Sequence, residues 1–318
     1  MLNKTVTLSR NLNGGVIPHI HKRLVILVLI FLNFNNPLYS EELTLMHDGV
    51  TLNASLDFPN DLSNLDDVIL ILHGGLAHKN MESITHLRSL LNDNHFVTLA
   101  INLSLSINNR QGMYDCKIPH RHTNDDAVKE VGIWVDWLIK RGVKRIVLLG
   151  HSRGGAQIAL YASEQLTSNI YKIILMAPAT KDNGASNYQR RFQQKLQPSL
   201  SRARKLVSAG KEDTLLSNSN VMFCEDSPVS AKTFVSYYGE ERRLDTPYLL
   251  PNITTPTLII VAGDDEVVVG LDKKIMHLSK MRNFTISVVE GSDHLFRDLN
   301  MDDAVEIVSE FLKNNSGI

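Results

Sequence analysis

Short apolar runs alternate along the chain with stretches in which apolar residues recur every three or four positions. The first pattern is typical of buried β-strands, and the second indicates helices that bury one face. The apolar runs cover residues 68–72, 96–101, 145–149, 173–177, 257–262 and 286–290. One helical stripe consists of Ala127, Val131, Trp134, Val135 and Leu138. This alternation predicts an α/β fold with a mostly parallel central sheet and helices on both faces.

Two segments depart from the alternation. Residues 43–47 and 51–58 are strand-like runs around an Asp-Gly turn at 48–49, so we expect an antiparallel hairpin at the sheet edge. Between residues 179 and 252 strand-like runs are largely absent. Helical patterns there cover residues 187–196, 199–208 and 228–238. We therefore expect a helical insertion over residues 179–252.

The first forty residues differ from the rest. Residues 1–23 contain no acidic residue and end in basic ones, and residues 24–32 are continuously apolar. A membrane span needs about 20 apolar residues, whereas a basic segment before a shorter apolar core is typical of a secretory signal peptide. We predict a signal peptide over residues 1–40, cleaved after Ser40, and export to the periplasm or the exterior. An uncleaved membrane anchor or a buried strand is the alternative.

Composition and charge describe an ordinary globular protein. Of the 318 residues, 43% are hydrophobic and 21% are charged, and the formal net charge is -1. The length fits one α/β domain over residues 41–318, and the charge balance gives no reason to expect nucleic acid as a partner. Export would allow the two cysteines, Cys116 and Cys224, to form a disulfide; two unbridged buried thiols are the alternative.

Residues 150–154 read Gly-His-Ser-Arg-Gly and join an apolar run to a helical pattern. Ser152 therefore lies on a tight strand-to-helix turn, where a strained backbone holds its hydroxyl away from the sheet. Gly150 and Gly154 leave room for this turn. The helix N-terminus directs backbone N–H groups at negative charge that forms beside the serine. A glycine-rich turn with a solvated serine has the same pattern, so the interpretation depends on partners elsewhere.

Three further loops supply such partners. Residues 73–75 read His-Gly-Gly after an apolar run, and a loop of this kind brings a backbone N–H to a developing oxyanion. Residues 264–266, Asp-Asp-Glu, follow the run at 257–262, and His294 follows the last run. The chain order is therefore serine, acid, histidine.

These motifs together resemble the α/β-hydrolase superfamily, from about Leu43 to the C-terminus. The resemblance implies that Ser152 is the nucleophile, that His294 is the general base and acid, and that Asp265 orients the imidazole. It also implies that the insertion over residues 179–252 is a helical lid over the pocket. No cofactor is required by this chemistry.

The same resemblance implies an oxyanion hole formed by backbone N–H groups. The first donor would be Arg153, which follows the nucleophile, and the second Gly75 in the His-Gly-Gly loop, with Leu76 as the alternative.

The position of the acid remains open between neighbours. The superfamily motif usually reads Gly-x-x-Asp followed by apolar residues, whereas Gly263 directly precedes Asp264 and Asp265. Alignment on the Asp-Glu-Val-Val that follows favours Asp265, with Asp264 as the alternative and Glu266 after it. Asp293, beside the histidine, is interpreted as a loop-capping residue.

A long polar loop covers residues 102–123, and loops of this size often line functional sites. His120 and His122 could bind a metal, but no third ligand stands at a standard zinc spacing. Thr123 and Asp126 are typical of a helix N-cap. We favour the cap and expect no metal.

The insertion is locally basic. Between residues 183 and 211 it has no acidic residue and contains Arg190, Arg191, Lys195, Arg202, Arg204, Lys205 and Lys211. Such a cluster would attract an anionic substrate or a membrane surface, with transient lipid contact through the lid. A solvated helix face is the simpler interpretation.

The expected function is hydrolysis of a small carboxylic ester through an acyl-enzyme, because nothing in the sequence indicates recognition of a peptide terminus or coenzyme A. Amides, thioesters and lactones are cleaved by the same kind of site. A peptidase or amidase, a cofactor-free haloperoxidase, or a non-catalytic binding protein on the same fold are the alternatives. Acyl chain length and oligomeric state are open.

Overall fold

The computed structural model describes residues 39–59, 65–165, 167–239 and 245–314. The predicted signal peptide lies outside the described residues except for its last two positions. Those two belong to strand β1, Tyr39–His47, so cleavage after Ser40 would fall inside this strand. Within the described residues, no helix is both long enough and apolar enough to span a membrane.

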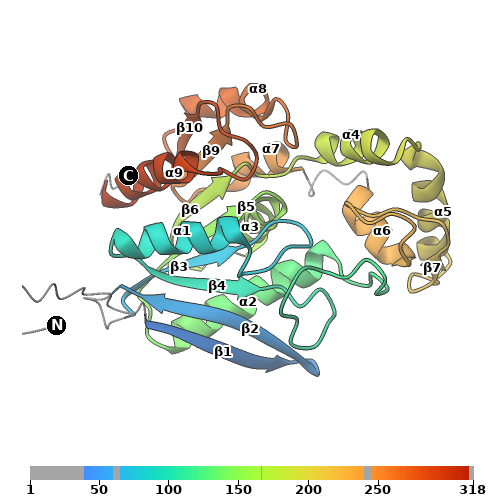
Figure 1. Ribbon diagram of the computed structural model, residues 1–318, viewed down its shortest axis with the longest axis horizontal. Helices are drawn as coiled ribbons and strands as arrows, with labels where there is room; N and C mark the ends of the chain where they lie inside the picture. The colour runs from blue at the N-terminus through green and yellow to red at the C-terminus, as the bar shows by residue number, and fades with distance from the viewer. Residues whose placement is uncertain (1–38, 60–64, 166, 240–244, 315–318) are drawn as a thin grey trace, which may run out of the picture. The chain divides into compact units, whose positions relative to one another are not determined.

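Eight strands form the main sheet, in the order β1-β2-β4-β3-β5-β6-β9-β10 (Figure 1). After β1 these are β2 (Val50–Phe58), β3 (Asp67–Leu72), β4 (Val97–Asn102), β5 (Arg145–His151), β6 (Ile170–Met176), β9 (Thr257–Ala262) and β10 (Phe284–Val289). Strands β1 and β2 form the expected edge hairpin, and β2 also pairs antiparallel with β4. The other pairs are parallel. The predicted mostly parallel sheet is confirmed.

Both faces of the sheet are buried, which explains the continuous apolar runs. Along β3, Leu70 packs into one core, which includes side chains from α2 (Asn124–Lys140) and α3 (Arg153–Glu164). The next residue, Ile71, packs into the other core with α1 (Glu82–Asp93) and α9 (Leu299–Lys313). Because successive strand side chains point to opposite faces, a strand such as β3 that is buried on both sides is apolar at consecutive positions, here from Val68 to Leu72.

The insertion is helical, with different boundaries from those predicted. It contains α4 (Lys181–Phe192), α5 (Leu196–Ser208), α6 (Ala231–Tyr238) and a two-stranded sheet of β7 (Leu215–Leu216) and β8 (Val229–Ser230). The helix expected over residues 187–196 is wrong at its end, because Gln193 adopts a left-handed conformation with φ of 51° and terminates α4. Figure 1 shows the three helices grouped together.

The remaining elements lead into the last two strands of the sheet. Helix α7 (Thr246–Leu249) and the 3-10 helix η2 (Leu250–Asn252) precede β9. Helix α8 (Leu271–Ile275) and the 3-10 helix η3 (Met276–Lys280) precede β10. The helix type changes at Met276, which is 63% exposed.

Candidate active site

Ser152 occupies the turn between β5 and α3, with φ of 55° and ψ of -121°. Positive φ is uncommon for a residue with a side chain and is retained where the surroundings enforce it. The flanking glycines are needed here. A Cβ at Gly150 would stand 2.6 Å from the Gly154 carbonyl oxygen, and a Cβ at Gly154 would stand 2.3 Å from the His73 carbonyl oxygen. The tight turn predicted from the sequence is therefore present.

Three side chains from separate loops meet at this turn. His294 Nε2 lies 2.8 Å from Ser152 Oγ. On the other side of the ring, His294 Nδ1 lies 2.8 Å from Asp265 Oδ2. Because the carboxylate can only accept, Nδ1 carries a proton and Nε2 is left to accept the proton of the serine hydroxyl. A serine hydroxyl beside a histidine that a carboxylate orients is the geometry that nucleophilic catalysis with a general base requires.

Asp265, rather than Asp264, faces the histidine. Its second carboxylate oxygen accepts hydrogen bonds of 2.7 Å from the backbone N–H groups of Val267 and Val268. Burial opposes ionisation, but the hydrogen bonds from His294 and from these two N–H groups outweigh it and lower the pKa of Asp265. Asp264 uses its backbone N–H to bind the Ser292 carbonyl, and its side chain is exposed.

The loop that carries His294 is held by its own hydrogen bonds. Asp293 Oδ1 accepts from the N–H groups of Leu295 and Arg297, so it caps the loop as expected. His151, next to the nucleophile, places Nε2 2.8 Å from the His294 carbonyl oxygen and donates to it. Burial lowers the pKa of His151 to about 4, which keeps its ring neutral at ordinary pH.

The expected oxyanion donors border the same space. A Cβ at Gly74 would stand only 3.2 Å from Ser152 Cβ, which shows how closely the His-Gly-Gly loop approaches the nucleophile. Gly75, Leu76 and Arg153 all line the pocket that contains Ser152. The N–H of Arg153 belongs to the first turn of α3, where backbone N–H groups have no partner within the helix.

A buried polar network that the sequence did not reveal supports the His-Gly-Gly loop. His73 Nε2 accepts from the N–H of Leu103 and lies 3.2 Å from Arg110 Nη2. Arg110 also donates to the carbonyl of Leu103 and to the side chain of Asn102. Burial, with the charge of Arg110, lowers the pKa of His73 to about 3. Arg110 stands in a polar loop without periodicity, so only its burial identifies it.

A pocket of about 840 Å³ opens over the nucleophile. Its floor consists of the His-Gly-Gly loop, Ser152 and His294. The lid contributes Tyr188 from α4, Met222 and Tyr238, so the insertion forms part of the wall. A cavity of this size is typical of a small-molecule site.

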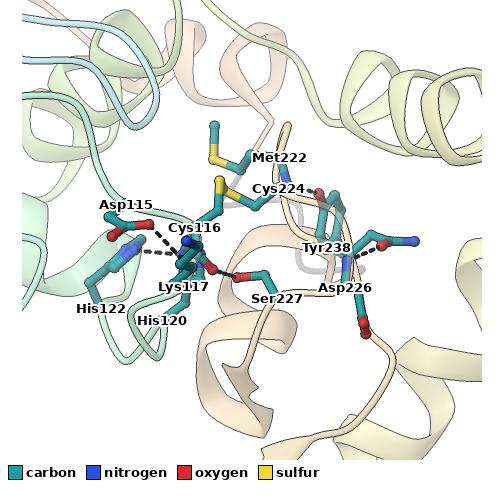
Figure 2. The surroundings of a disulfide bond; sticks show 11 residues. Asp115, Cys116, Lys117, His120, His122, Met222, Cys224, Asp226, Ser227 and Tyr238 are labelled. Carbon is teal, nitrogen blue, oxygen red and sulfur yellow. Dashed lines mark hydrogen bonds between the residues drawn. A yellow bond between two sulfur atoms is a disulfide. The ribbon is translucent and has the colours of Figure 1, made fainter.

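A disulfide joins the lid to the long polar loop (Figure 2). Cys116 and Cys224 are bonded, which settles the alternative of two free thiols. Beside it, Ser227 Oγ donates to the Cys116 carbonyl at 2.5 Å, and the N–H of Met222 donates to Tyr238 Oη at 2.7 Å. The Met222 side chain reaches the oxyanion loop, because a Cβ at Gly75 would stand 2.8 Å from its Cε.

The two histidines of the long loop are packed inside the protein. His120 Nδ1 lies 3.3 Å from His122 Nε2, and His122 Nδ1 lies 2.9 Å from Tyr237 Oη. Within the described residues, no group of three or more metal-ligating side chains is found. Thr123 and Asp126 form the predicted capping box at the start of α2.

Known proteins share this architecture. A model of the alpha/beta hydrolase fold matches residues 67–248. A Mycoplasma pneumoniae protein named "Putative esterase/lipase 3" is 26% identical over 189 residues, which is 57% of this chain and 68% of that protein.

Solved structures resemble it over a greater length. Est1E from Butyrivibrio proteoclasticus has a TM-score of 0.62 at 19% identity, over 85% of this chain and 97% of its own. The Pyrococcus furiosus esterase PF2001 has a TM-score of 0.57 at 16% identity, over 88% and 92%. At these identities the likeness concerns the fold. The family model matches more than half of this chain, which shows that the chain belongs to the alpha/beta hydrolase fold family.

Proposed function

We propose that this protein is a serine hydrolase that cleaves a small carboxylic ester through an acyl-enzyme. The observation that carries the proposal is the relay in which Ser152, His294 and Asp265 are joined by two hydrogen bonds of 2.8 Å. A strained serine at a strand-to-helix turn, a histidine within hydrogen-bond reach of its hydroxyl and a buried carboxylate are the groups that acyl transfer requires.

In the first half of the reaction, Ser152 Oγ attacks the ester carbonyl while His294 Nε2 takes the hydroxyl proton. The N–H groups of Arg153 and Gly75 stabilise the oxyanion. His294 then gives the proton to the leaving alcohol, and the acyl group stays on the serine. In the second half, His294 takes a proton from water, the resulting hydroxide attacks the acyl-enzyme, and the acid leaves as Ser152 regains its proton.

Active-site labelling tests the proposal. A fluorophosphonate probe should label the wild-type protein and should fail to label Ser152→Ala, because the probe reacts with an activated serine. Turnover of para-nitrophenyl esters of graded chain length should vanish in the same variant. An unlabelled, folded wild-type protein would mean that the site is catalytically silent and that the fold serves binding.

The leaving group distinguishes esterase from amidase activity. The ammonium group of a peptide N-terminus needs an acidic partner inside the pocket. The lining residues Asp264 and Glu266 are exposed to solvent. We expect kcat/KM for aryl esters to exceed that for aminoacyl amides with the same acyl group. The reverse order would assign the protein to the peptidases.

The proposal places the enzyme outside the cytoplasm, in an oxidising compartment. The sequence pattern of residues 1–40 and the Cys116–Cys224 disulfide support this location. Fusion of residues 1–45 to a reporter that is active only after export tests it: activity is expected, and an inactive reporter that stays in the cytoplasm would contradict it.

A further inference from the structure

In the part of the chain that the structure describes, four arginines line the pocket, and two of them are bound to neighbouring protein groups. Arg297 forms an ion pair of 3.0 Å with Asp293. Arg190 donates to the side chain of Asn187 and to the backbone carbonyl of Glu266. The hydrogen-bonding capacity of these two guanidinium groups is therefore partly used within the protein.

The other two arginines, Arg153 and Arg191, have no ion-pair or hydrogen-bond partner among the described residues. Arg153 follows the nucleophile, and its guanidinium stacks over the ring of Tyr237 with 5.0 Å between Cζ and the ring centre. Its Nε is fully buried without an acceptor. A buried donor without an acceptor is costly, so it points to a polar ligand group.

A second buried polar atom without a partner lies in the same wall. The Tyr188 side chain is 1% exposed and lines the pocket, and its hydroxyl has no hydrogen-bond partner among the described residues. Its ring packs against the ring of Tyr238 at 5.3 Å. The Tyr238 hydroxyl accepts from the N–H of Met222, which leaves its own proton available as a donor.

Arg153, Arg191, Tyr188 and Tyr238 line the same pocket. Burial raises the pKa of Tyr238 to about 12, and the positive charges of Arg153 and Arg191 both oppose this shift. Among the described residues, the acidic side chains that line the pocket without an ion pair are Asp264 and Glu266, and both are exposed on the loop after β9. The wall formed by the lid and the start of α3 thus combines hydrogen-bond donors, positive charge and aromatic rings.

We propose that this wall is a carboxylate-binding subsite, so that the preferred substrate is an ester that also carries a carboxylate on an apolar or aromatic body. The inference rests on the proposed ester hydrolysis and specifies its substrate. Arg153 would bind the carboxylate with its planar guanidinium, Tyr188 would donate from its hydroxyl, and the exposed Arg191 would attract the anion at the mouth.

Matched ester pairs test the subsite. In one pair the carboxylate is in the leaving group: para-acetoxybenzoate against the neutral para-acetoxybenzamide. In the other pair the carboxylate is in the acyl group: the mono-para-nitrophenyl ester of pimelic acid is compared with the same ester in which the free acid is replaced by an amide. For at least one pair, wild-type kcat/KM should favour the acid by roughly 10- to 100-fold, because charge-assisted hydrogen bonds are the strong ones. The pair that responds shows which part of the substrate lies against the lid.

The quantity to compare between variants is the ratio of kcat/KM for the acid to kcat/KM for the neutral ester, called the preference below. Arg153→Gln should abolish it, Arg153→Lys should restore part of it, and Tyr188→Phe should reduce it while keeping the ring packing. Arg202→Gln is the matched control, because this lid arginine lies outside the pocket and its loss changes the net charge equally. The control should keep the wild-type preference.

Binding separates this inference from the proposed function. For the ester pair that responds, titration calorimetry with Ser152→Ala should show tighter binding of the acid than of its neutral amide, and the difference should disappear in Ser152→Ala with Arg153→Gln. Equal affinities, or a preference that survives Arg153→Gln, would overturn the subsite even if ester turnover is strong. Absence of turnover and labelling with intact acid binding would instead remove the hydrolase proposal alone.

Discussion

The backbone conformation of Ser152 depends on the absence of side chains at Gly150 and Gly154. Ser152 keeps a positive φ where the backbone leaves no room for side chains on either side: a Cβ at Gly150 would meet the start of α3, and a Cβ at Gly154 would meet the end of β3. The clashes would be with backbone carbonyl oxygens, which cannot rotate away. The strain at the serine is therefore maintained by packing around it.

Gly154→Ala should consequently be destabilising. The added methyl would meet the His73 carbonyl oxygen at 2.3 Å, so strand and helix must separate. We expect a loss of about 1–3 kcal/mol in the free energy of unfolding, measured by urea denaturation. Gly112→Ala is the matched control, because nothing lies within 4 Å of a Cβ at that position. Equal stability of the two variants would contradict the close approach.

Substitution of single residues tests which of the adjacent carboxylates, Asp264 or Asp265, orients His294. Asp265→Asn removes the acceptor that fixes the proton of His294 on Nδ1, and the ring then presents the wrong tautomer to Ser152. We expect kcat for a para-nitrophenyl ester to fall about 10³- to 10⁴-fold. Asp264→Asn should have a much smaller effect. If Asp264→Asn alone abolishes turnover, the assignment of the acid is wrong.

At the scale of elements, the lid is tied to the body by covalent and polar contacts in one region. The Cys116–Cys224 bond joins residues that are 108 positions apart in the sequence. Strand β8 contacts the long polar loop over residues 102–123, because the N–H of Ser230 donates to the His120 carbonyl. These contacts flank Met222, whose Cε would stand 2.8 Å from a Cβ at Gly75 in the His-Gly-Gly loop. The pocket wall therefore depends on a connection between two segments that are distant in sequence.

Removal of the disulfide should loosen this wall and destabilise the protein. For Cys116→Ser with Cys224→Ser we expect a loss of about 3–4 kcal/mol, because a long closed loop restricts the unfolded chain. Denaturation midpoints measured with and without dithiothreitol check this, together with KM for a bulky ester, which should rise. The reductant should lower the wild-type midpoint and leave the double variant unchanged; an insensitive wild type would contradict the bond.

At the scale of the whole molecule, four of the histidines that the structure describes are buried in neutral form. Burial lowers the pKa of His73 and His122 to about 3, and that of His120 and His151 to about 4. In the unfolded chain a histidine takes up a proton below a pH of about 6.5. Acidification through this range therefore favours the unfolded state. Burial raises the pKa of Glu130 to about 6, which acts in the opposite direction, but as one group against four.

We expect the free energy of unfolding to fall as the pH is lowered from about 6.5 towards 4, with each neutral buried histidine contributing up to ~1.4 kcal/mol per pH unit. Urea denaturation across this range measures the slope. His122→Gln should give a shallower slope, and the exposed His277→Gln is the control. A flat profile, or equal slopes in the two variants, would contradict the prediction.

Much of the architecture follows from local patterns. The two-sided burial of the strands requires unbroken apolar runs, so the sheet, its edge hairpin and the covering helices could be predicted. Boundaries inside the lid could not. Gln193 ends α4 in a left-handed conformation, although neither glycine nor proline stands at that position to indicate a helix end. Arg110 contacts His73 of the His-Gly-Gly loop from a segment without periodicity.

The sequence by itself determined the elements and the strand-to-helix turn at Ser152, because side-chain period and glycine sterics act between near neighbours. The tertiary structure decided which carboxylate faces His294, that Cys116 reaches Cys224, and that Arg153 lies beside the lid tyrosines. These relations join segments that are distant along the chain. Their geometry depends on how the loops at the ends of the strands converge, and no local pattern encodes that convergence.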